Sequence, residues 1–296
     1  LATLNIHLQL FRTMGWKAPK YVHTAQLMKM DGGSKRKLSK RKDPELALDF
    51  YNAEGYPVPS VLEYLMTLLN SNFEDWRLAN PTAPMGDFQF TTKKMGNSGS
   101  LFDIDKLKDV SKNTISVMSA DQVYDEVTAW AKDFDPQLYT LLTADQQKAK
   151  AIFAIGRGGA KPRKDIAIWS EVKDYVAFFY EELFTAASEY PENVSTQDAL
   201  DILTQYRSLY SPADDGETWF NKVRELGESL GFAAKPKDYK KNPDQYKGHV
   251  GDVSQVIRLA ITGRTNSPDL CSVMQILGEE VCQQRLAQAI ELLSNR

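Results

Sequence analysis

The sequence is poor in the residues that build metal centres and disulfide frameworks, since its 296 residues include two cysteines and three histidines. Cys271 and Cys282 stand eleven positions apart, and neither has a second cysteine or a histidine at the spacing of zinc ligands. We therefore expect no zinc site and two reduced, structural thiols. A disulfide-stapled mini-protein is excluded, and 42% hydrophobic residues exclude a disordered chain.

Long hydrophobic runs are also absent. The densest apolar stretch, residues 176–180, is far shorter than the roughly 18 residues that cross a bilayer. The chain opens on Leu1 with an apolar, helix-like segment and has no signal-peptide pattern. We expect a cytoplasmic protein without a membrane partner, and a chain that is the downstream part of a longer protein.

Charge of either sign is not in large excess, because the formal net charge is −3. This average hides an uneven distribution. Residues 1–43 carry ten Lys and Arg against two Asp and Glu, whereas residues 44–296 carry 26 against 37. The acidic average therefore does not exclude a nucleic-acid partner, which is bound by local basic patches.

The first 43 residues contain three kinds of local pattern. Apolar residues recur at three- and four-residue steps from Leu1 to Phe11, and Gly15 is expected to end that helix. Residues 21–28 are typical of a short extended segment, and the Asp-Gly-Gly sequence at 31–33 is typical of a turn. The basic run that follows is expected to lie on a loop.

Beyond about residue 44 the helical spacing continues almost without interruption, which predicts a mainly α fold, a helical array rather than a parallel sheet. Residues 80–100 and 156–164 are rich in loop-forming residues and suggest boundaries. The signals for helix ends are Ser60 as a cap, Ser119 with Gln122 as a capping box, Thr196 ahead of an apolar stripe, Gly263 as a terminator and Ser267-Pro268 as a start.

Residues 35–42, with the sequence Lys-Arg-Lys-Leu-Ser-Lys-Arg-Lys, form the densest cluster of positive charge. Placed on a mobile loop, their ammonium groups and the serine hydroxyl can meet the oxygens of a polyphosphate. On charge alone, the favoured interpretations are a solvated surface loop, a nuclear-localisation-like run or a non-specific RNA contact.

The order of residues in this run favours a polyphosphate contact over these alternatives. Lys37-Leu38-Ser39-Lys40-Arg41 resembles the K-M-S-K-S signature of class I aminoacyl-tRNA synthetases, in the K-L-S-K-R form common among glutamyl-tRNA synthetases. The flanking residues 6–23 resemble that family's approach to the loop. Near the other end, residues 256–264, 267–270 and 277–280 resemble its anticodon-binding region. The resemblance covers both ends of the chain in the correct order.

The resemblance implies three regions: the end of a catalytic domain with the signature loop at 1–43, a helical connecting or stem-contact domain at 44–145, and a helical anticodon-binding region at 146–296. It implies a ligase that activates glutamate with ATP and transfers it to the 3′ end of tRNA(Glu). Lys40 would contact ATP and act in catalysis with Lys37, and Ser39 would support the loop. Mg²⁺ is expected to accompany ATP, although its ligands are not identifiable in this sequence.

The chain lacks the H-I-G-H-like motif of the family's nucleotide-binding half, because none of its three histidines stands in that context. We therefore expect that half to lie upstream of Leu1 and residues 1–296 alone to form no adenylate. Two alternatives remain open. One is a non-catalytic tRNA-binding or regulatory protein derived from a synthetase tail, and the other is a glutaminyl-tRNA synthetase, which the helical periodicity of residues 196–296 disfavours.

Candidate tRNA contacts lie in the basic stretches of the second half. They are Arg163 in the loop at 156–164, Lys247 in the stretch 235–247, and Arg258 and Arg264 near the helix ending at Gly263. For each of them a solvated helical surface is the equally weighted alternative. The adjacent carboxylates Asp214-Asp215 and Glu181-Glu182 are expected to be solvated, and the aromatic cluster at 169–180 is expected to lie in the core.

Overall fold

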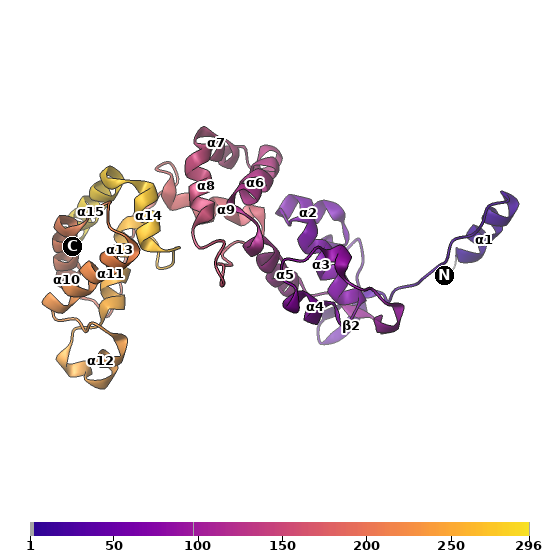
Figure 1. The fold of residues 1–296 in the computed structure, drawn as a ribbon, viewed down its shortest axis with the longest axis horizontal. Coiled ribbons are helices and arrows are strands. Elements are labelled where there is room, and N and C mark those ends of the chain that lie inside the picture. Colours follow the sequence, from indigo (N-terminus) through magenta and orange to yellow (C-terminus); the bar gives the residue numbers. More distant parts are fainter. Residues whose placement is uncertain (1–2, 97, 296) are drawn as a thin grey trace. The chain divides into compact units, whose positions relative to one another are not determined.

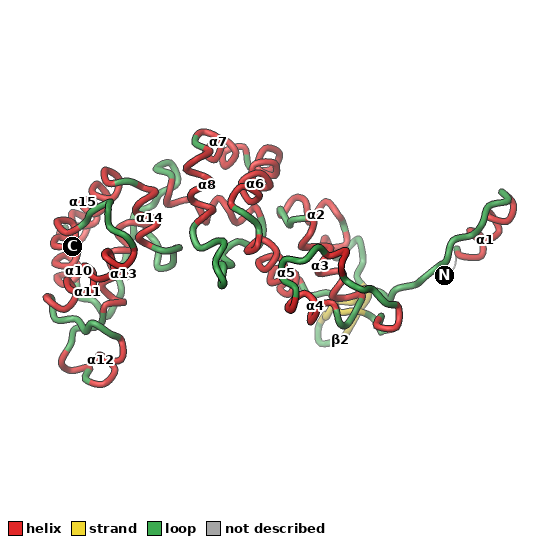
Figure 2. The backbone as a smooth tube through the Cα atoms, in the orientation of Figure 1, coloured by secondary structure: helices red, strands yellow, loops and turns green. Residues whose placement is uncertain are grey.

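Helices dominate the computed structural model, which describes residues 3–96 and 98–295 (Figures 1 and 2). The fifteen α-helices within these residues are α1 (Leu4–Thr13), α2 (Leu48–Glu54), α3 (Val58–Leu69), α4 (Phe73–Ala79), α5 (Ile104–Val117), α6 (Ala120–Phe134), α7 (Pro136–Ala144), α8 (Gln146–Ala154), α9 (Val172–Val176), α10 (Thr196–Leu209), α11 (Gly216–Ser229), α12 (Pro236–Lys241), α13 (Val250–Thr262), α14 (Leu270–Leu277) and α15 (Glu279–Ser294). The predicted mainly α class is confirmed.

The described residues form a single small sheet of three strands, β1 (Leu27–Asp31), β2 (Ser34–Lys37) and β3 (Ser100–Leu101), in the order β2-β1-β3. Strands β1 and β2 are antiparallel neighbours, and β3 pairs with β1 in parallel. The predicted extended segment is therefore shifted along the chain, because the strand starts at Leu27 rather than near residue 21.

The chain folds as two compact units. The first comprises Leu1–Leu48 and Val61–Leu107, and the second comprises Asp49–Ser60 and Lys108–Arg296. This division follows packing, whereas the regions 1–43, 44–145 and 146–296 were inferred from a family resemblance and remain a prediction.

Aromatic side chains form much of the core of the first unit. The rings of Tyr64 and Phe102 meet edge to face with centroids 5.3 Å apart, and those of Phe73 and Phe88 do the same at 5.0 Å. The Tyr64 hydroxyl accepts a hydrogen bond from the backbone N–H of Asp103 at 2.6 Å. This contact ties the start of α5 to α3 within the unit that carries the sheet.

The second unit has one continuous apolar core, to which helices α6 to α8, the aromatic segment, helices α10 and α11 and helices α13 to α15 contribute. Trp169, Phe178, Phe179 and Tyr180 are buried in it, so the predicted core role of the aromatic cluster is confirmed. Helices α10, α11, α13 and α15 pack on one another, and α14 contacts both α15 and α8.

A buried arginine of α15 connects three parts of this unit. Arg285 Nη1 donates to the carbonyl oxygens of Phe178 and Ile261 at 2.8 and 2.7 Å, and Nη2 donates to Glu181. Its guanidinium carbon lies 3.6 Å from the centroid of the Phe184 ring. Glu181 is therefore an ion-pair partner and not the purely solvated residue that its position beside a second glutamate suggests.

The helix ends agree with most local signals. The capping box of Ser119 and Gln122 is present, and α13 ends at Gly263 in the left-handed region. Gly15 likewise has a positive φ, directly after Met14, the cap of α1, although Leu1 of the predicted stripe lies outside the described residues. Ser60 is not a cap, because α3 starts at Val58 and the Ser60 side chain is buried.

Other polar residues have more specific roles at helix ends than the sequence suggested. Helix α14 starts at Leu270 behind Asp269, two residues later than predicted. His249 caps α13 in a box with Asp252. Asp215 caps α11, and Asp214 pairs with Lys222, so neither is simply solvated surface.

No helix within residues 3–96 and 98–295 combines the length and the apolar character needed to cross a bilayer.

Candidate functional site

The basic run begins on a strand and not on a loop, because two glycines turn the chain back on itself. Gly32 and Gly33 have φ values of +55° and +85°, which only glycine adopts readily, and this turn places Asp31 opposite Ser34. Residues 34–37 then pair with β1 as strand β2, with Lys37 opposite Met28. The predicted loop is thereby shortened to the residues that follow Lys37.

The alternation of a strand separates the positive charges of the run. Successive side chains of β2 point to opposite faces, so Lys35 and Lys37 lie on one face and Arg36 on the other. Both lysines are exposed, whereas Arg36 is half-buried. Neighbouring cations of the sequence are therefore not equivalent in space.

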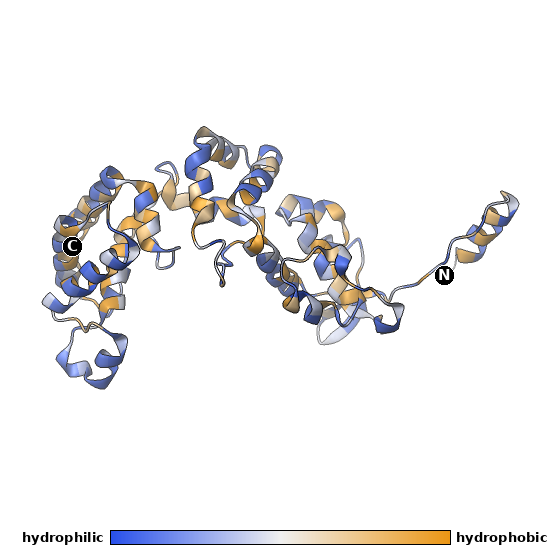
Figure 3. Cartoon of the chain, in the orientation of Figure 1, coloured by the Kyte–Doolittle hydropathy of each residue, from blue (hydrophilic) through white to orange (hydrophobic). Residues whose placement is uncertain are grey.

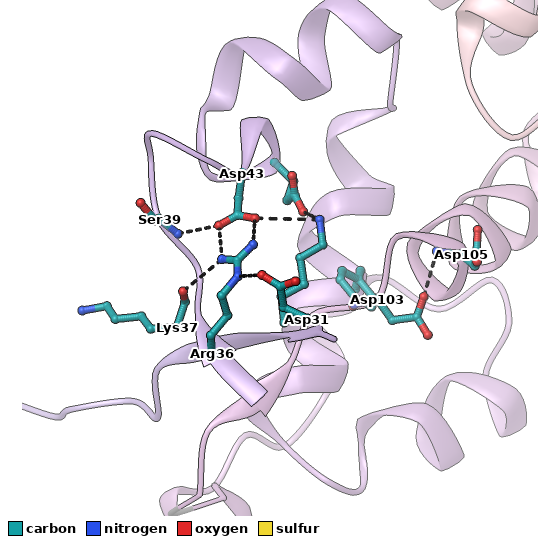
Figure 4. A network of polar contacts seen from close by, with 10 residues as sticks. Asp31, Arg36, Lys37, Ser39, Asp43, Asp103 and Asp105 are labelled. Carbon is teal, nitrogen blue, oxygen red and sulfur yellow. Dashed lines mark hydrogen bonds and ion pairs between the residues drawn. The ribbon is translucent and has the colours of Figure 1, made fainter. Parts of the chain in front are cut away.

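Arg36 is held by two aspartates (Figure 4). Its Nη1 and Nη2 donate to Oδ2 and Oδ1 of Asp43, each at 2.7 Å, and its Nε donates to Oδ2 of Asp31 at 2.6 Å. The first contact is a bidentate pair, the strongest geometry available to a guanidinium and a carboxylate. The Asp43 side chain is 1% exposed, so this pair lies under the surface of the loop.

Asp43 also closes the turn that carries the rest of the run. The backbone N–H of Ser39 donates to Oδ2 of Asp43 at 2.7 Å, and the N–H of Asp43 donates to the Ser39 carbonyl at 2.8 Å. The N–H of Lys42 donates to the same carbonyl at 3.0 Å. Residues 39 and 43 are thus joined twice, and residues 40–42 lie between these joints.

Further polar contacts surround this carboxylate. Lys29 of β1 pairs with Glu45, and its Nζ lies 3.9 Å from Oδ1 of Asp43. The Arg36 guanidinium, followed by the Ser39 N–H, holds the pKa of Asp43 well below its usual range. Asp43 in turn raises the pKa of Arg36. The carboxylate is therefore charged throughout the neutral range.

The five signature residues differ in their surroundings. Leu38 is buried, and its N–H donates to the Leu27 carbonyl at 3.1 Å, which extends the hairpin by one bond. Ser39 is half-buried, whereas the side chains of Lys37, Lys40 and Arg41 are exposed. A buried leucine thus anchors the junction between β2 and the turn, and three exposed cations flank it, an arrangement that suits a polyphosphate.

The candidate tRNA contacts of the second unit have partners within the protein. Arg163 forms two hydrogen bonds with Asp165 at 2.6 and 2.9 Å, and Arg264 forms two with Asp174 at 2.8 and 2.7 Å. Arg264 holds the pKa of Asp174 below its ordinary value. Both arginines line a groove of about 300 Å³ that also has apolar walls, from Phe178 and Pro268. They border one site although they are about a hundred residues apart in the chain.

The two other candidates lie in different settings. Arg258 is half-buried, and its Nη1 donates to the carbonyl and the hydroxyl of Ser267 at 3.3 and 3.0 Å. Burial lowers the pKa of Arg258. Lys247 pairs with Asp198 at 2.5 Å at the edge of an exposed segment. Arg258 therefore positions the Ser267 turn, while Lys247 belongs to the surface.

Lys247 closes a protruding segment that we call the lysine loop, residues 235–247. Its base is fixed by the hydrogen bonds from the Ala233 N–H to the Gly248 carbonyl and from the Lys247 N–H to the Gly231 carbonyl, at 2.9 and 3.0 Å. Figure 3 shows α12 and its surroundings as a hydrophilic segment. The exposed lysines of the loop are Lys235, Lys237, Lys240, Lys241 and Lys247.

Metal binding has no candidate among the described residues, because no three or more His, Cys, Asp and Glu side chains cluster there in a geometry that holds an ion. Cys271 and Cys282 are free and buried, in agreement with the predicted structural thiols.

The family follows from the second half of the chain. A family model described as "Anticodon binding domain" matches residues 129–290, which is more than half of the sequence. The chain belongs to this family. The match includes Arg163, Lys247, Arg258 and Arg264, whereas the signature loop lies outside the anticodon-binding domain.

Curated relatives extend the similarity over nearly the whole chain. Glutamate–tRNA ligase of Acetivibrio thermocellus is 49% identical over 290 residues, which are 98% of this chain and 53% of the relative. The enzyme of Clostridium beijerinckii is 46% identical over 297 residues, 99% of this chain and 54% of the relative. The chain thus spans about half the length of the curated relatives it matches. The predicted resemblance to glutamyl-tRNA synthetases is confirmed.

Solved structures support the same fold. The glutamate tRNA ligase from Elizabethkingia meningosepticum, solved in complex with its amino acid, matches with a TM-score of 0.63 at 20% identity, over 98% of this chain and 55% of that one. The glutamate-tRNA synthetase from Elizabethkingia anophelis matches with the same TM-score at 19% identity. The anticodon-binding domain and the smaller unit therefore both have counterparts in these folds.

The sequence did not reveal the residues that organise the loop and the groove. Asp43, Asp165 and Asp174 were missed, and Arg36 was not distinguished from the other cations of the run. The one available signal was the position of Asp43, an acidic residue that directly follows the basic run at residues 35–42. Asp165 stands only two residues from its partner Arg163, but nothing in that spacing marks the pair. Asp174 carries no signal at all, because its partner Arg264 lies 90 residues away.

Proposed function

We propose that this chain is part of a glutamate–tRNA ligase, which activates glutamate with ATP and transfers it to the 3′ end of tRNA(Glu). In this proposal the chain supplies the ATP-contacting loop and the surface that binds the tRNA anticodon, and the protein works in the cytoplasm. The observation that carries it is the identity of 49% with such a ligase across 98% of the chain.

The geometry of the loop agrees with a role at the departing pyrophosphate. Negative charge moves onto that group as the adenylate forms, so a cation fixed beside it stabilises the transition state more than the ground state. Lys40 lies in the closed turn with its side chain exposed, and Lys37 projects from the adjoining strand. We assign the main contact to Lys40, with Lys37 and Ser39 supporting it.

Mg²⁺ normally accompanies ATP and would neutralise part of its phosphate charge. The acidic residues near the loop do not fit as its ligands, since Asp31 and Asp43 already hold Arg36. No step is therefore assigned to the metal on this chain. The loop residues bind and orient phosphate through their own charges.

The anticodon-binding domain offers two surfaces for RNA. One is the lysine loop, whose exposed ammonium groups suit a phosphate backbone. The other is the groove with Arg163 and Arg264, where guanidinium planes can stack on unpaired bases. Both arginines are pre-oriented by their aspartates, so their side chains lose little freedom when RNA binds.

The replacement Lys40→Ala in the full-length protein tests the loop assignment. We expect the rate of glutamate-dependent ATP–pyrophosphate exchange to fall about 100-fold, because one preorganised contact to the developing charge is removed. The dissociation constant for tRNA should change less than about twofold. Lys93→Ala is the matched control, since Lys93 is an exposed lysine of the same unit and removing it changes the net charge equally.

Equal losses of exchange and tRNA affinity in Lys40→Ala would make the loop an RNA contact, as in a non-catalytic tRNA-binding protein. A preference for glutamine over glutamate in the exchange assay would instead favour a glutaminyl-tRNA synthetase. For residues 1–296 alone we expect no exchange, and clear glutamate-dependent exchange by this piece would contradict the proposed division of the ATP site.

A further inference from the structure

The carboxylate of Asp43 makes more contacts than a surface ion pair needs. Both of its oxygens accept from Arg36, Oδ2 also accepts from the Ser39 N–H, and Lys29 approaches Oδ1. These partners are all donors, and the Asp43 side chain is almost completely buried. Burying a charge is unfavourable unless such partners surround it, so this local structure depends on all of them together.

The second observation concerns where these contacts lead. Arg36 lies on β2, directly before the signature residues, and Ser39, the third signature residue, begins the turn that ends at Asp43. Asp43 bonds to both, so one side chain sets the distance between the hairpin and the turn (Figure 4). The Lys40 side chain is exposed, and its direction is set by the backbone of this turn.

We propose that Asp43 is a positioning residue of the ATP-contacting loop, which holds the Ser39–Asp43 turn so that the Lys40 ammonium lies where the pyrophosphate departs. Arg36 is its structural counter-ion and not a phosphate ligand. The proposal rests on the proposed function of Lys40 and assigns a division of labour within the basic run. One arginine holds the loop, and the exposed cations contact the phosphates.

The physical reason for such a device is the sensitivity of catalysis to placement. An ammonium group stabilises a developing charge only at hydrogen-bonding distance, and a displacement of about 1 Å can cost about 100-fold in rate. A lysine has a long, flexible side chain, so the backbone that carries it has to be fixed by other groups. The two joints between Ser39 and Asp43 supply this restraint.

The test is Asp43→Asn in the full-length protein. Asparagine keeps the size and one accepting oxygen, but its NH₂ group faces the donors of Arg36 or Ser39 and breaks part of the network. We expect kcat for ATP–pyrophosphate exchange to fall about 10- to 100-fold. KM for ATP and the dissociation constant for tRNA should each stay within about twofold, because the exposed cations remain.

A structural measurement on the same variant separates the two layers of the proposal. The Ser39 amide donates to Asp43, so its hydrogen exchange should become at least about ten times faster in Asp43→Asn. Faster hydrogen exchange at Ser39 together with an unchanged kcat for ATP–pyrophosphate exchange would overturn the catalytic part of the proposal. If Lys40→Ala also left kcat unchanged, the proposed function of the loop would fail. The faster hydrogen exchange at Ser39 would still establish that Asp43 holds the turn.

Two further variants guard against a general loss of structure. Arg36→Lys keeps the charge but not the bidentate geometry, so we expect a smaller loss of kcat in the same direction. Glu74→Gln breaks the exposed ion pair with Lys106 in the same unit and should leave kcat unchanged. Equal losses in Glu74→Gln and Asp43→Asn would show a non-specific stability effect and overturn the positioning role.

Discussion

The thiol of Cys282 lies in the core of the anticodon-binding domain, where its Sγ is 3.5 Å from the carbonyl oxygen of Met274. Burial in apolar surroundings raises the pKa of this thiol from an ordinary value of 9.0 to about 11. A thiolate is the reactive form of cysteine, so this residue is kept inert at neutral pH. Cys282 packs in the core, and its raised pKa makes the free energy of unfolding depend on pH in the alkaline range.

The shift predicts how stability depends on pH. Between about pH 9 and 11 the unfolded thiol loses its proton while the folded thiol keeps it. The contribution of Cys282 is therefore complete below pH 9 and declines as pH rises toward 11, by at most about 1.4 kcal/mol per pH unit. Urea unfolding at a series of pH values should show a flatter alkaline decline in Cys282→Ala than in the unmodified protein.

Cys282→Ser is the matched control for this effect. Serine differs from alanine in size and polarity and changes the absolute stability differently, but neither side chain ionises in this range. The two variants should therefore share the flatter decline. If the free energy of unfolding declined with pH as steeply in both variants as in the unmodified protein, Cys282 would not be the source of the alkaline dependence.

At the same scale, the sequence located the basic run but not the contacts that hold it. The signature Lys37 to Arg41 is a local pattern and was found directly. The separation of Arg36 from its neighbours depends on the alternation of a strand that the turn at Gly32 creates. The pairing of Arg264 with Asp174 joins positions 90 residues apart, and no spacing rule reports such a contact.

The end of α13 shows how one residue can determine where a helix stops. Helix α13 ends at Gly263, whose φ is +69°. A Cβ atom added there would lie 2.0 Å from the Thr185 carbonyl oxygen, which is backbone and cannot rotate away. Glycine is required at this position both by its dihedral angle and by the close approach of a neighbouring segment.

The replacement Gly263→Ala separates these two requirements when it is compared with Gly158→Ala. Gly158 has a similar φ of +74°, lies in the same unit and has no atom within 4 Å of an added Cβ. We expect Gly158→Ala to lower the free energy of unfolding by about 1 kcal/mol, the cost of the left-handed conformation alone. Gly263→Ala should cost at least about 2 kcal/mol more, because the 185–187 segment has to move.

Urea unfolding followed by circular dichroism measures both values in the same protein. Equal costs for the two variants would mean that the Thr185 segment yields without strain. In that case the role of Gly263 would be conformational only.

For the elements, the sequence was most informative where the determining contacts are local. The capping box of Ser119 and Gln122 spans three residues and was predicted correctly. The Ser60 side chain follows no such rule, because its burial and its contact with the Ser111 hydroxyl at 3.1 Å come from the packing of α5. The sheet was the least predictable element, since β3 joins β1 from about 70 residues away.

The whole molecule carries its charge in separate patches, so a net charge of −3 does not conflict with the proposed binding of tRNA. Some acidic residues of the second unit form ion pairs within the protein. Asp165, Asp174 and Asp198 each pair with an arginine or lysine side chain. In the lysine loop, Lys235, Lys237, Lys240 and Lys241 are exposed and remain available to phosphate. Affinity for tRNA should therefore depend on this patch and on ionic strength, not on the average charge.

The salt dependence of tRNA binding tests this distribution of charge. Replacing Lys237, Lys240 and Lys241 by Gln in the full-length protein should weaken tRNA binding, because fewer phosphates are neutralised and fewer counterions are released. We expect the slope of log Kd against log salt concentration to fall by about 0.9 for each phosphate that is no longer neutralised, and by about 2 to 3 in the triple variant.

Replacement of the same three lysines by Arg keeps the charge and should keep the slope. A slope that is unchanged by the Gln substitutions would place the phosphate-binding cations elsewhere, whereas equally reduced slopes in the Gln and Arg variants would point to a disturbed loop structure rather than to charge.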